Sequence, residues 1–473
     1  MNTLNAYSSS GGQLYPLLDK RPFSFSNDQA VNLTIKEQRN ESINPTVFPQ
    51  NIRTDNTVQR IEFNVPYASD GSMYDLKNTY IECTFAHGIL FANNVGLAPF
   101  CADSMITDCQ VFLNSTLVSE QHTNLYPWAS LAKNLLIEKR PCVPGLASGF
   151  ISEDCVEEGL YMSHPLLTTI TAAGGGGGVD AYNFTKTYMN NGAMTFRVKL
   201  RLKEGIFMQP NFISADMNLR IVLFLNIYQG FIDQAEILVG SVGNNPVTLT
   251  NIQLQLQRVM LTEDAKRGLS GGLNVSTLKY PLLYCKIETK TIPNGSLNFN
   301  THIFTSQTKP NLLIFFVQHN PANLAAQAAQ PYLVCGSNVS GATGARTSPQ
   351  IQSLFVRVNG KQYPKPEGNS LSCYDILTYR RYVDMCLEDS QDVYLDFLHW
   401  QNQYTAYVIN LNDDVMGKMW GMQSFDELTS IDVYMSFFLP GTTVTSTLYC
   451  IAMSHASIEV DAKGNITKRN YVS

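Results

Sequence analysis

The sequence predicts an all-β protein built from two tandem β-sandwiches, with a few short helices in the loops. Two observations carry this prediction. Many short segments alternate apolar and polar residues with a period of two, which is typical of strands with one buried face. In addition, a unit of strand, Asn-containing turn, strand and helix occurs once in each half of the chain. The length of 473 residues suits two domains, because all-β domains commonly have about 200–250 residues.

The second copy of this unit spans residues 351–384 and shows the pattern most clearly. Apolar and polar residues alternate along 351–358, and Asn359-Gly360 follows. This dipeptide tolerates positive φ at both turn positions and therefore favours a tight hairpin. A helix is predicted after it, with Ser372 as N-cap. The apolar face of this helix is expected to consist of Ile376, Leu377, Tyr379, Tyr382 and Val383.

The first copy of the unit spans residues 106–137. A strand at 111–113 reaches a turn at Asn114-Ser115, and a short second strand follows. A helix is predicted next, with Pro127 in its first turn, where the missing N–H of proline would be unpaired anyway. Its apolar stripe consists of Leu125, Trp128, Leu131, Leu135 and Leu136.

The segments after each unit also correspond in order. Residues 217–226 (MNLRIVLFLN) correspond to 431–440 (IDVYMSFFLP), and residues 251–264 correspond to 447–461. A repeat of this length is not a solenoid period and indicates two copies of one domain. Residues 311–318 (NLLIFFVQ) are apolar almost throughout and predict a strand buried on both faces.

These patterns divide the chain into three predicted segments: a polar N-terminal arm at 1–55, a first sandwich at 56–264 and a second at 265–473. Charge and glycine at 262–274 are typical of a linker. The segment 139–192 contains five consecutive glycines, which cannot hold a fixed conformation cheaply, so an exposed loop is predicted there.

Composition favours a protein that buries much of its surface against other copies. Only 15% of residues are charged, against roughly 25% in an average soluble protein. The net charge of −6 argues against nucleic-acid binding, which needs a basic face to neutralise phosphates. No signal peptide and no transmembrane segment are evident. We therefore expect a chain made in cytoplasm or nucleus and not secreted, with its ten cysteines as free thiols.

No motif predicts a catalytic, cofactor-binding or metal site, and we expect no enzyme activity and no cofactor. The glycine run at 174–178 lacks the strand, helix and Gly-Lys-Ser/Thr ending of a phosphate-binding loop. Ser163-His164 and Asp413-Asp414 lack the context of a nucleophile elbow or an acid/base pair. The histidines show no metal-like spacing and no neighbouring carboxylate motif; they are His87, His122, His164, His302, His319, His399 and His455.

The aromatic residues near position 400 leave a second class of function open. Trp400, Tyr404, Tyr407 and Trp420 could form a carbohydrate-binding face, although core or subunit packing uses such residues more often. The alternatives are therefore a glycan-binding or glycan-cleaving β-sandwich protein, or a receptor-binding spike.

Several of these segments give the sequence a resemblance to a known family, the double jelly-roll major capsid proteins. It is most similar to those of Polinton/Maverick elements, adintoviruses and virophages. The likeness covers most of residues 55–473 in patches, and the polyglycine loop and the insertion at 320–350 depart from it. The segments that carry it are 75–85, 108–118 and 126–136 in the first half, and 280–281, 311–318, 354–382 and 457–467 in the second.

The resemblance implies that each half is an eight-stranded jelly roll and that the chain is a non-enzymatic major capsid protein. Such chains form homotrimers whose six lobes make a pseudo-hexagonal capsomer, and these capsomers tile an icosahedral virion shell. The implied partners are further copies of the chain as lattice neighbours, a separate penton protein, and minor or cement capsid proteins. Long loops would form an outward tower.

Overall fold

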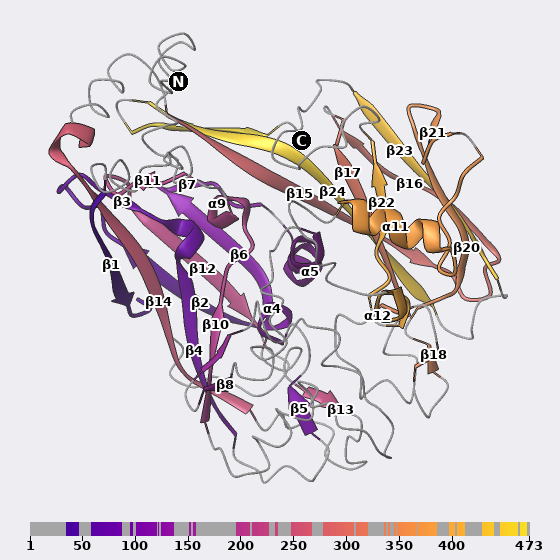
Figure 1. Cartoon of the computed structure of the whole chain (residues 1–473), viewed down its shortest axis with the longest axis horizontal. Helices are drawn as coiled ribbons and strands as arrows, with labels where there is room; N and C mark the ends of the chain where they lie inside the picture. Colours follow the sequence, from indigo (N-terminus) through magenta and orange to yellow (C-terminus); the bar gives the residue numbers. More distant parts are fainter. Residues whose placement is uncertain are drawn as a thin grey trace, which may run out of the picture.

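A computed structural model of the chain shows two β-sandwiches side by side (Figure 1). The structure describes residues 35–46, 58–87, 95–97, 101–120, 122, 124–136, 151–152, 155–157, 195–208, 211–226, 232–234, 247–266, 278–306, 309–319, 335–336, 339–340, 345–346, 348–366, 368–385, 397–402, 404–411, 428–438, 445–461 and 464–470. The predictions for the glycine run 174–178 and for most of the loop 139–192 lie outside these residues.

The first sandwich combines a 4-stranded sheet with an 8-stranded sheet. The smaller sheet has the order β2 (Gln59–Val65), β12 (Leu219–Leu225), β6 (Ile106–Leu113), β7 (Thr116–Leu117). The larger has the order β11 (Ile213–Ser214), β3 (Ser72–Tyr74), β14 (Val247–Leu261), β4 (Tyr80–His87), β10 (Thr195–Leu200), β9 (Cys155–Glu157), β8 (Ile151–Ser152). The eighth strand, β1 (Ile35–Ile43), lies outside this order and pairs with β14.

The second sandwich combines a 4-stranded sheet with a 5-stranded sheet. The first of these has the order β16 (Asn298–Ser306), β23 (Thr429–Phe437), β20 (Ile351–Val358), β21 (Lys361–Tyr363). The other has the order β15 (Leu278–Ile292), β24 (Ser446–Val460), β17 (Leu312–His319), β22 (Tyr407–Asn410), with β25 (Ile466–Asn470) paired to β24. Two small two-stranded sheets pair β5 (Val95–Leu97) with β13 (Ile232–Gln234) and β18 (Val339–Ser340) with β19 (Ala345–Arg346).

The helices within the described ranges are few and short, as predicted. They are η1 (Leu76–Asn78), α4 (Cys101–Met105), α5 (Tyr126–Leu136), α9 (Gly205–Met208), α11 (Ile376–Met385) and α12 (Phe397–Asn402). No helix among the described residues is long and apolar enough to cross a membrane.

Strand order confirms the predicted duplication. The sheet β2-β12-β6-β7 has the same order, by position in its half, as β16-β23-β20-β21. Likewise β1, β14, β4 and β10 of the first sandwich correspond to β15, β24, β17 and β22 of the second. Each sandwich therefore contains the same eight antiparallel strands of a jelly roll, and the first adds short strands at both edges, β3 and β11 beside β14 and β8 and β9 beyond β10.

The two predicted Asn turns occupy the same connection, β6 to β7 and β20 to β21. Asn114 and Ser115 have φ values of 44° and 69°, and Asn359 and Gly360 have values of 49° and 80°. The side chain of each Asn also accepts the same hydrogen bond from a backbone N–H. The Asn114 side chain accepts from the N–H of Asn218 at 2.9 Å, and that of Asn359 accepts from Ser430 at 2.8 Å. The turn chemistry is thus duplicated along with the strands.

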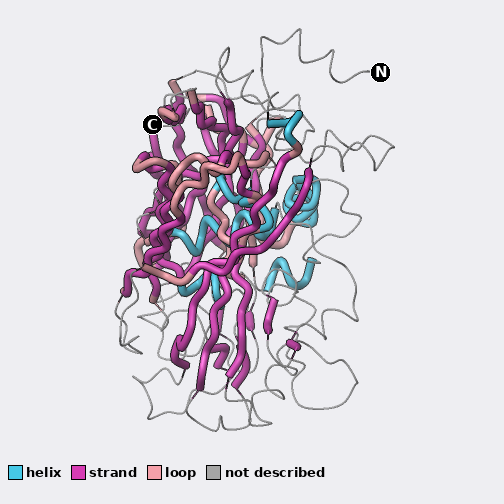
Figure 2. Tube along the Cα trace, turned by 90° about the vertical axis from the view of Figure 1, so that its left-hand side faces the viewer, coloured by secondary structure: helices cyan, strands magenta, loops and turns pink. Residues whose placement is uncertain are grey.

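The long strands β15 and β24 belong to both sandwiches. They pair without interruption from Leu278↔Val460 to Ile292↔Ser446. At one end the ribbon packs into the core of the second sandwich, and at the other Tyr280 and Ile458 pack into the core of the first. Figure 1 shows this ribbon running from one sandwich to the other, and Figure 2 shows the same chain turned by 90°.

Strand β17 is buried along its whole length, as its sequence predicted. Leu313, Phe315 and Val317 face the core of the second sandwich. The alternate residues Leu312, Ile314 and Phe316 face outward, where helices α5, α11 and α12 cover them. Strand β17 is therefore buried on both of its faces.

Two details of α11 differ from the prediction. Asp375, not Ser372, caps the helix: its Oδ1 accepts from the N–H of Leu377 at 2.9 Å. Ser372 instead bonds to the carbonyl of Ile351. Ile376 and Leu377 do not lie on the buried face with Tyr382 but are both 60% exposed. The apolar run at 376–377 sits at the N-terminus of the helix, where both side chains point away from the sheet.

Burial on both faces of β17 predicts that Phe315→Ala and Phe316→Ala will destabilise the protein to a similar degree. Each should lower the free energy of unfolding by about 3–5 kcal/mol, the usual cost of deleting a buried Phe. The control is Phe355→Ala, whose half-buried ring stacks on Tyr434 on the outer side of β20 and should cost much less. Denaturant titration measures the three values; a cost for Phe316→Ala as small as that of the control would contradict the assignment.

Candidate functional site

Helix α5 of the first sandwich forms the centre of the interface between the two sandwiches. All its residues are buried, which is unusual for a helix that carries Lys133 and Asn134. On one side Trp128 stacks on Tyr449 of β24, with ring centroids 3.9 Å apart, and lies 5.6 Å from the ring of Phe316. This side therefore covers the outer face of the second sandwich.

The other side of α5 is polar and bonds to the first sandwich. Ser130 Oγ donates to a carboxylate oxygen of Asp103 in α4, and Asn134 Nδ2 donates to the other oxygen at 2.8 Å. The hydroxyl of Tyr126, at the start of the helix, accepts from the N–H of Lys203 at 2.8 Å. These bonds fix the helix on the sandwich from which it comes.

Lys133 is the cation of a fully buried ionic cluster. Its Nζ donates to both carboxylate oxygens of Glu120 at 2.8 Å and to the carbonyl of Lys203 at 2.6 Å. The N–H of Glu120 donates to Glu204 Oε2 at 2.9 Å. Every donor of the ammonium thus has an acceptor, which is the condition under which a buried charge is tolerated.

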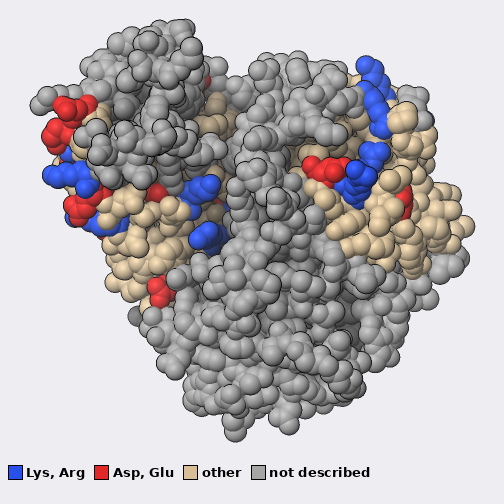
Figure 3. All heavy atoms as spheres, in the orientation of Figure 1, with Lys and Arg blue, Asp and Glu red and all other residues tan. Residues whose placement is uncertain are grey.

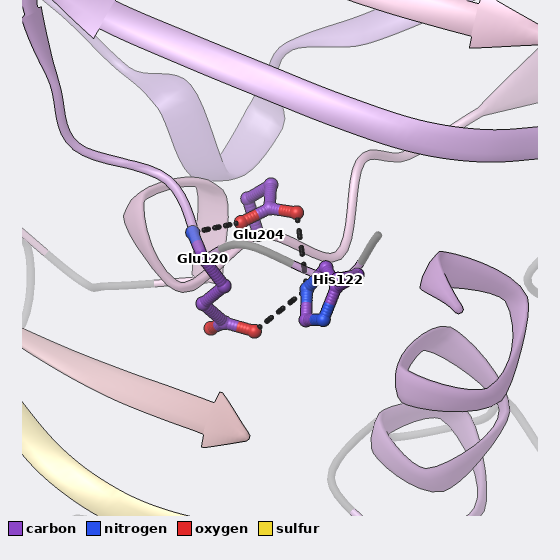
Figure 4. A group of neighbouring side chains, drawn as sticks. All are labelled: Glu120, His122 and Glu204. Atoms are coloured by element: carbon purple, nitrogen blue, oxygen red, sulfur yellow. Dashed lines mark hydrogen bonds and ion pairs between the residues drawn. The ribbon is translucent and has the colours of Figure 1, made fainter. Parts of the chain in front are cut away.

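His122 lies between the two acids of this cluster (Figure 4). Its Nε2 is 3.0 Å from Glu120 Oε2 and 3.4 Å from Glu204 Oε1, which are ion-pair distances. Neither contact has the angles of a hydrogen bond, so the attraction is that of a charged imidazolium for two carboxylates. Burial alone would lower the pKa of His122, but Glu204 and Glu120 outweigh it and raise the pKa to about 9.

Burial and neighbouring charges also oppose each other in their effects on the pKa values of Glu120 and Lys133. Burial would raise the pKa of Glu120, but Lys133 and His122 lower it below its ordinary value. Burial would lower the pKa of Lys133, but the surrounding acidic groups raise it. Two carboxylates thus face two cations, and the cluster is neutral as a whole.

The cluster borders the second sandwich directly. Gly205, next to Glu204, comes so close to β15 that a Cβ at this position would lie 2.4 Å from the carbonyl oxygen of Leu283. Cys285 of the same strand lies beside Lys133, and burial raises the pKa of its thiol. The cluster therefore holds α5, α9 and the crossing strand β15 in one arrangement.

Glu120, His122 and Glu204 are also the one group among the described residues whose ligand atoms could converge on a metal ion, since these atoms lie within 4.8 Å of one another. Lys133 already engages both oxygens of Glu120, and protonated His122 completes the charge balance without an added cation. We therefore interpret the group as an ion-pair cluster.

Sequence reasoning missed this cluster. It found no carboxylate near any histidine, although Glu120 precedes His122 by two residues. That spacing was a usable signal, whereas Glu204 and Lys133 join the site only through the fold. Two other histidines have simple roles: His302 forms an exposed ion pair with Asp432, and His319 bonds to Ser446.

The aromatic residues considered for carbohydrate binding are core residues. Trp400, Tyr404 and Tyr407 are buried, and Trp400 Nε1 donates to the carbonyl of Ala406. Buried rings cannot stack on a sugar. Trp420, Asp413-Asp414 and Ser163-His164 lie outside the described residues. The described free thiols, all buried, are Cys83, Cys109, Cys285, Cys335, Cys373 and Cys450.

An exposed apolar patch lies on the second sandwich near the start of α11. It consists of Tyr374, Ile376, Leu377 and Phe438, all exposed. Tyr374 and Phe438 meet edge to face with their centroids 5.4 Å apart. Single exposed apolar residues are ordinary, but a contiguous group of this kind marks an interaction surface.

The ionic cluster predicts that Lys133→Met will lower the free energy of unfolding by about 3–5 kcal/mol, because it leaves a buried carboxylate without its cation. The double variant Lys133→Met/Glu120→Gln, which restores neutrality, should recover part of this loss. The control Lys266→Met removes a surface ion pair with Glu263 and should cost less than about 1 kcal/mol. Denaturant titration of the four proteins would refute the assignment if the double variant were no more stable than Lys133→Met.

His122 predicts a loss of stability at alkaline pH. Its pKa is raised from 6.5 to about 9 in the folded protein, so its contribution is complete below pH 6.5 and is lost as the pH rises through 9. The thermal midpoint should fall across this range, and His122→Gln should flatten the decline. The control His302→Gln, which alters an exposed histidine, should show the same decline of the thermal midpoint as the wild type. An unchanged slope in His122→Gln would show that another group titrates.

No protein-family model matches the sequence, and no curated protein matches it. Solved structures match it over nearly its whole length. The cryo-EM structure of the Sputnik virophage matches with a TM-score of 0.57 and 13% identity, covering 93% of this chain and 89% of that one. The major capsid protein of mavirus matches with a TM-score of 0.50 and 10% identity, covering 96% and 95%.

A third match is PBCV-1 VP54, fitted into a cryo-EM reconstruction of Sputnik, with a TM-score of 0.53, 10% identity and coverage of 91% and 96%. At these identities the likeness establishes the architecture. Together with the duplicated strand order, it shows that this chain has the double jelly-roll fold of virophage and PBCV-1 major capsid proteins.

Proposed function

We propose that this chain is a major capsid protein, which forms homotrimeric, pseudo-hexagonal capsomers that tile an icosahedral virion shell. The observation that carries the proposal is the occurrence of the same eight-strand order twice in one chain. The full-length likeness to capsid proteins of viruses and virophages supports it.

Duplication suits this function for a geometric reason. Three copies of a chain with two similar lobes place six similar lobes around a threefold axis, and six neighbours are what a hexagonal lattice needs. Closed cyclic symmetry buries the interacting surfaces of every subunit without open-ended growth. Sheet edges that the chain leaves open need cover, and neighbouring subunits provide it.

The distribution of charge supports a role in the shell rather than on the genome. On the face shown in Figure 3, the described Lys, Arg, Asp and Glu side chains form small groups in which both signs occur side by side. With a net charge of −6, binding through phosphate neutralisation has little support. The proposed partners are lattice neighbours, a penton protein at the vertices, and minor or cement proteins. The proposed location is the virion, after synthesis in host cytoplasm or nucleus.

The domain limits remain part of this proposal: an arm at 1–55, a first jelly roll at 56–264 and a second at 265–473. Strand β14 of the first sandwich ends at Leu261, and β15 begins at Leu278. Within the proposed arm, β1 (Ile35–Ile43) pairs with β14, so part of it adds a strand to the first sandwich.

Purified protein should form a stable homotrimer. Multi-angle light scattering should give about three times the chain mass of 52.7 kDa, because an obligate interface of the expected kind buries on the order of 2,000–5,000 Å². Negative-stain microscopy of the same sample should show hexagonal particles. A monomer that persists at micromolar concentration and melts cooperatively on its own would defeat the proposal.

A further inference from the structure

Helix α11 is the counterpart of α5 in the second sandwich. Each follows the same hairpin, β6-β7 for α5 and β20-β21 for α11. The two helices nevertheless differ in their surroundings. Helix α5 is buried on all sides because the neighbouring sandwich covers it, whereas in α11 only Thr378 and Tyr382 are buried. The second sandwich thus presents a helix of the same origin without the cover that its counterpart has.

The contact between the two sandwiches shows how such a helix is covered. Helix α5 places Trp128 and Leu131 on the outer face of the sheet β15-β24-β17-β22 in the next sandwich. Its counterpart sheet in the first sandwich is β1-β14-β4-β10. Suppose that one rotation relates the first sandwich to the second and that the same rotation relates the second sandwich to the first sandwich of the next copy. Helix α11 then meets the sheet β1-β14-β4-β10 of that next copy.

We infer that the apolar patch of Tyr374, Ile376, Leu377 and Phe438, together with the exposed face of α11, docks on the outer face of the sheet β1-β14-β4-β10 of a second copy of this chain. The inference rests on the proposed trimer and names the surfaces that would form it. The occupant is a second copy because the same contact already exists within the chain, between its own two sandwiches.

Each surface carries charged side chains. Arg380 and Asp384 are exposed on α11, and Arg381 is half-buried. On β4, Ile81 and Cys83 point into the core of the first sandwich, so Glu82 between them faces outward. Glu82 accepts from the Gln255 amide of β14 at 3.4 Å and lies opposite Lys199 of β10 in the strand register. An arginine from α11 can add a further ion pair to this half-buried acid once the apolar patch has excluded water around it.

The docking face is thus apolar at the start of α11 and charged along the helix, and it faces a polar sheet. Such an arrangement, with an aromatic and aliphatic centre and a charged rim, is typical of interfaces between protein subunits. It also accounts for the exposure of Ile376 and Leu377, which the free chain leaves in water.

The test is the double variant Ile376→Asp/Leu377→Asp in the full-length chain. Both side chains are 60% exposed, so the fold of each chain should persist, as circular dichroism would verify. Light scattering should show the mass falling from that of three chains to that of one. The matched control is Leu428→Asp, which alters a leucine that is 70% exposed just before β23, at the opposite end of this strand from Phe438. It should remain trimeric.

A second test uses charge and does not touch the apolar residues. Arg380→Glu should weaken the trimer, and the exchange Arg380→Glu/Glu82→Arg should restore it. A trimer that survives both Ile376→Asp/Leu377→Asp and Arg380→Glu would overturn the assigned surface while leaving the capsid proposal intact. A wild-type chain that is monomeric would instead defeat the capsid proposal itself, so the two failures are distinguishable.

Discussion

The burial of strand β17 on both of its faces determines the architecture of this protein. The residues of β17 that face the core and those that face outward are equally apolar, and all of them are buried. The outward-facing residues need a cover, and part of it comes from α5, a helix that belongs to the other sandwich. The second sandwich therefore buries part of its apolar surface against the first, although each has a core of its own.

The ionic cluster restricts the relative orientation of the two sandwiches. Apolar packing is tolerant of small shifts, because dispersion and area burial have little angular preference. The bonds from Lys133 to Glu120 and to the carbonyl of Lys203 permit one arrangement, and Gly205 leaves no room for another between α9 and β15. A buried ion pair seldom adds much net stability over apolar residues of the same shape. Its contribution here is to fix the angle between the two sandwiches.

Much of the fold was predictable from local pattern. Period-two alternation identified the strands, Asn359-Gly360 identified a hairpin, and the recurrence of the same turn at Asn114 revealed the duplication. The failures have a common cause, which is that they concern contacts between distant segments. The union of His122 with Glu204 follows from the fold alone. The exposure of Ile376 depends on how α11 sits on its sheet, and periodicity does not report this. The cap at Asp375, in contrast, is a local contact with Leu377 that was assigned to Ser372 instead.

The ribbon of β15 and β24 also sets an order of events during synthesis. Ile458 and Val460, close to the C-terminus of the chain, complete the core of the first sandwich. A ribosome that has finished the first sandwich's own strands has therefore not yet produced all the residues that its core contains. The core of the first sandwich is therefore completed only after β24 of the second sandwich has been made.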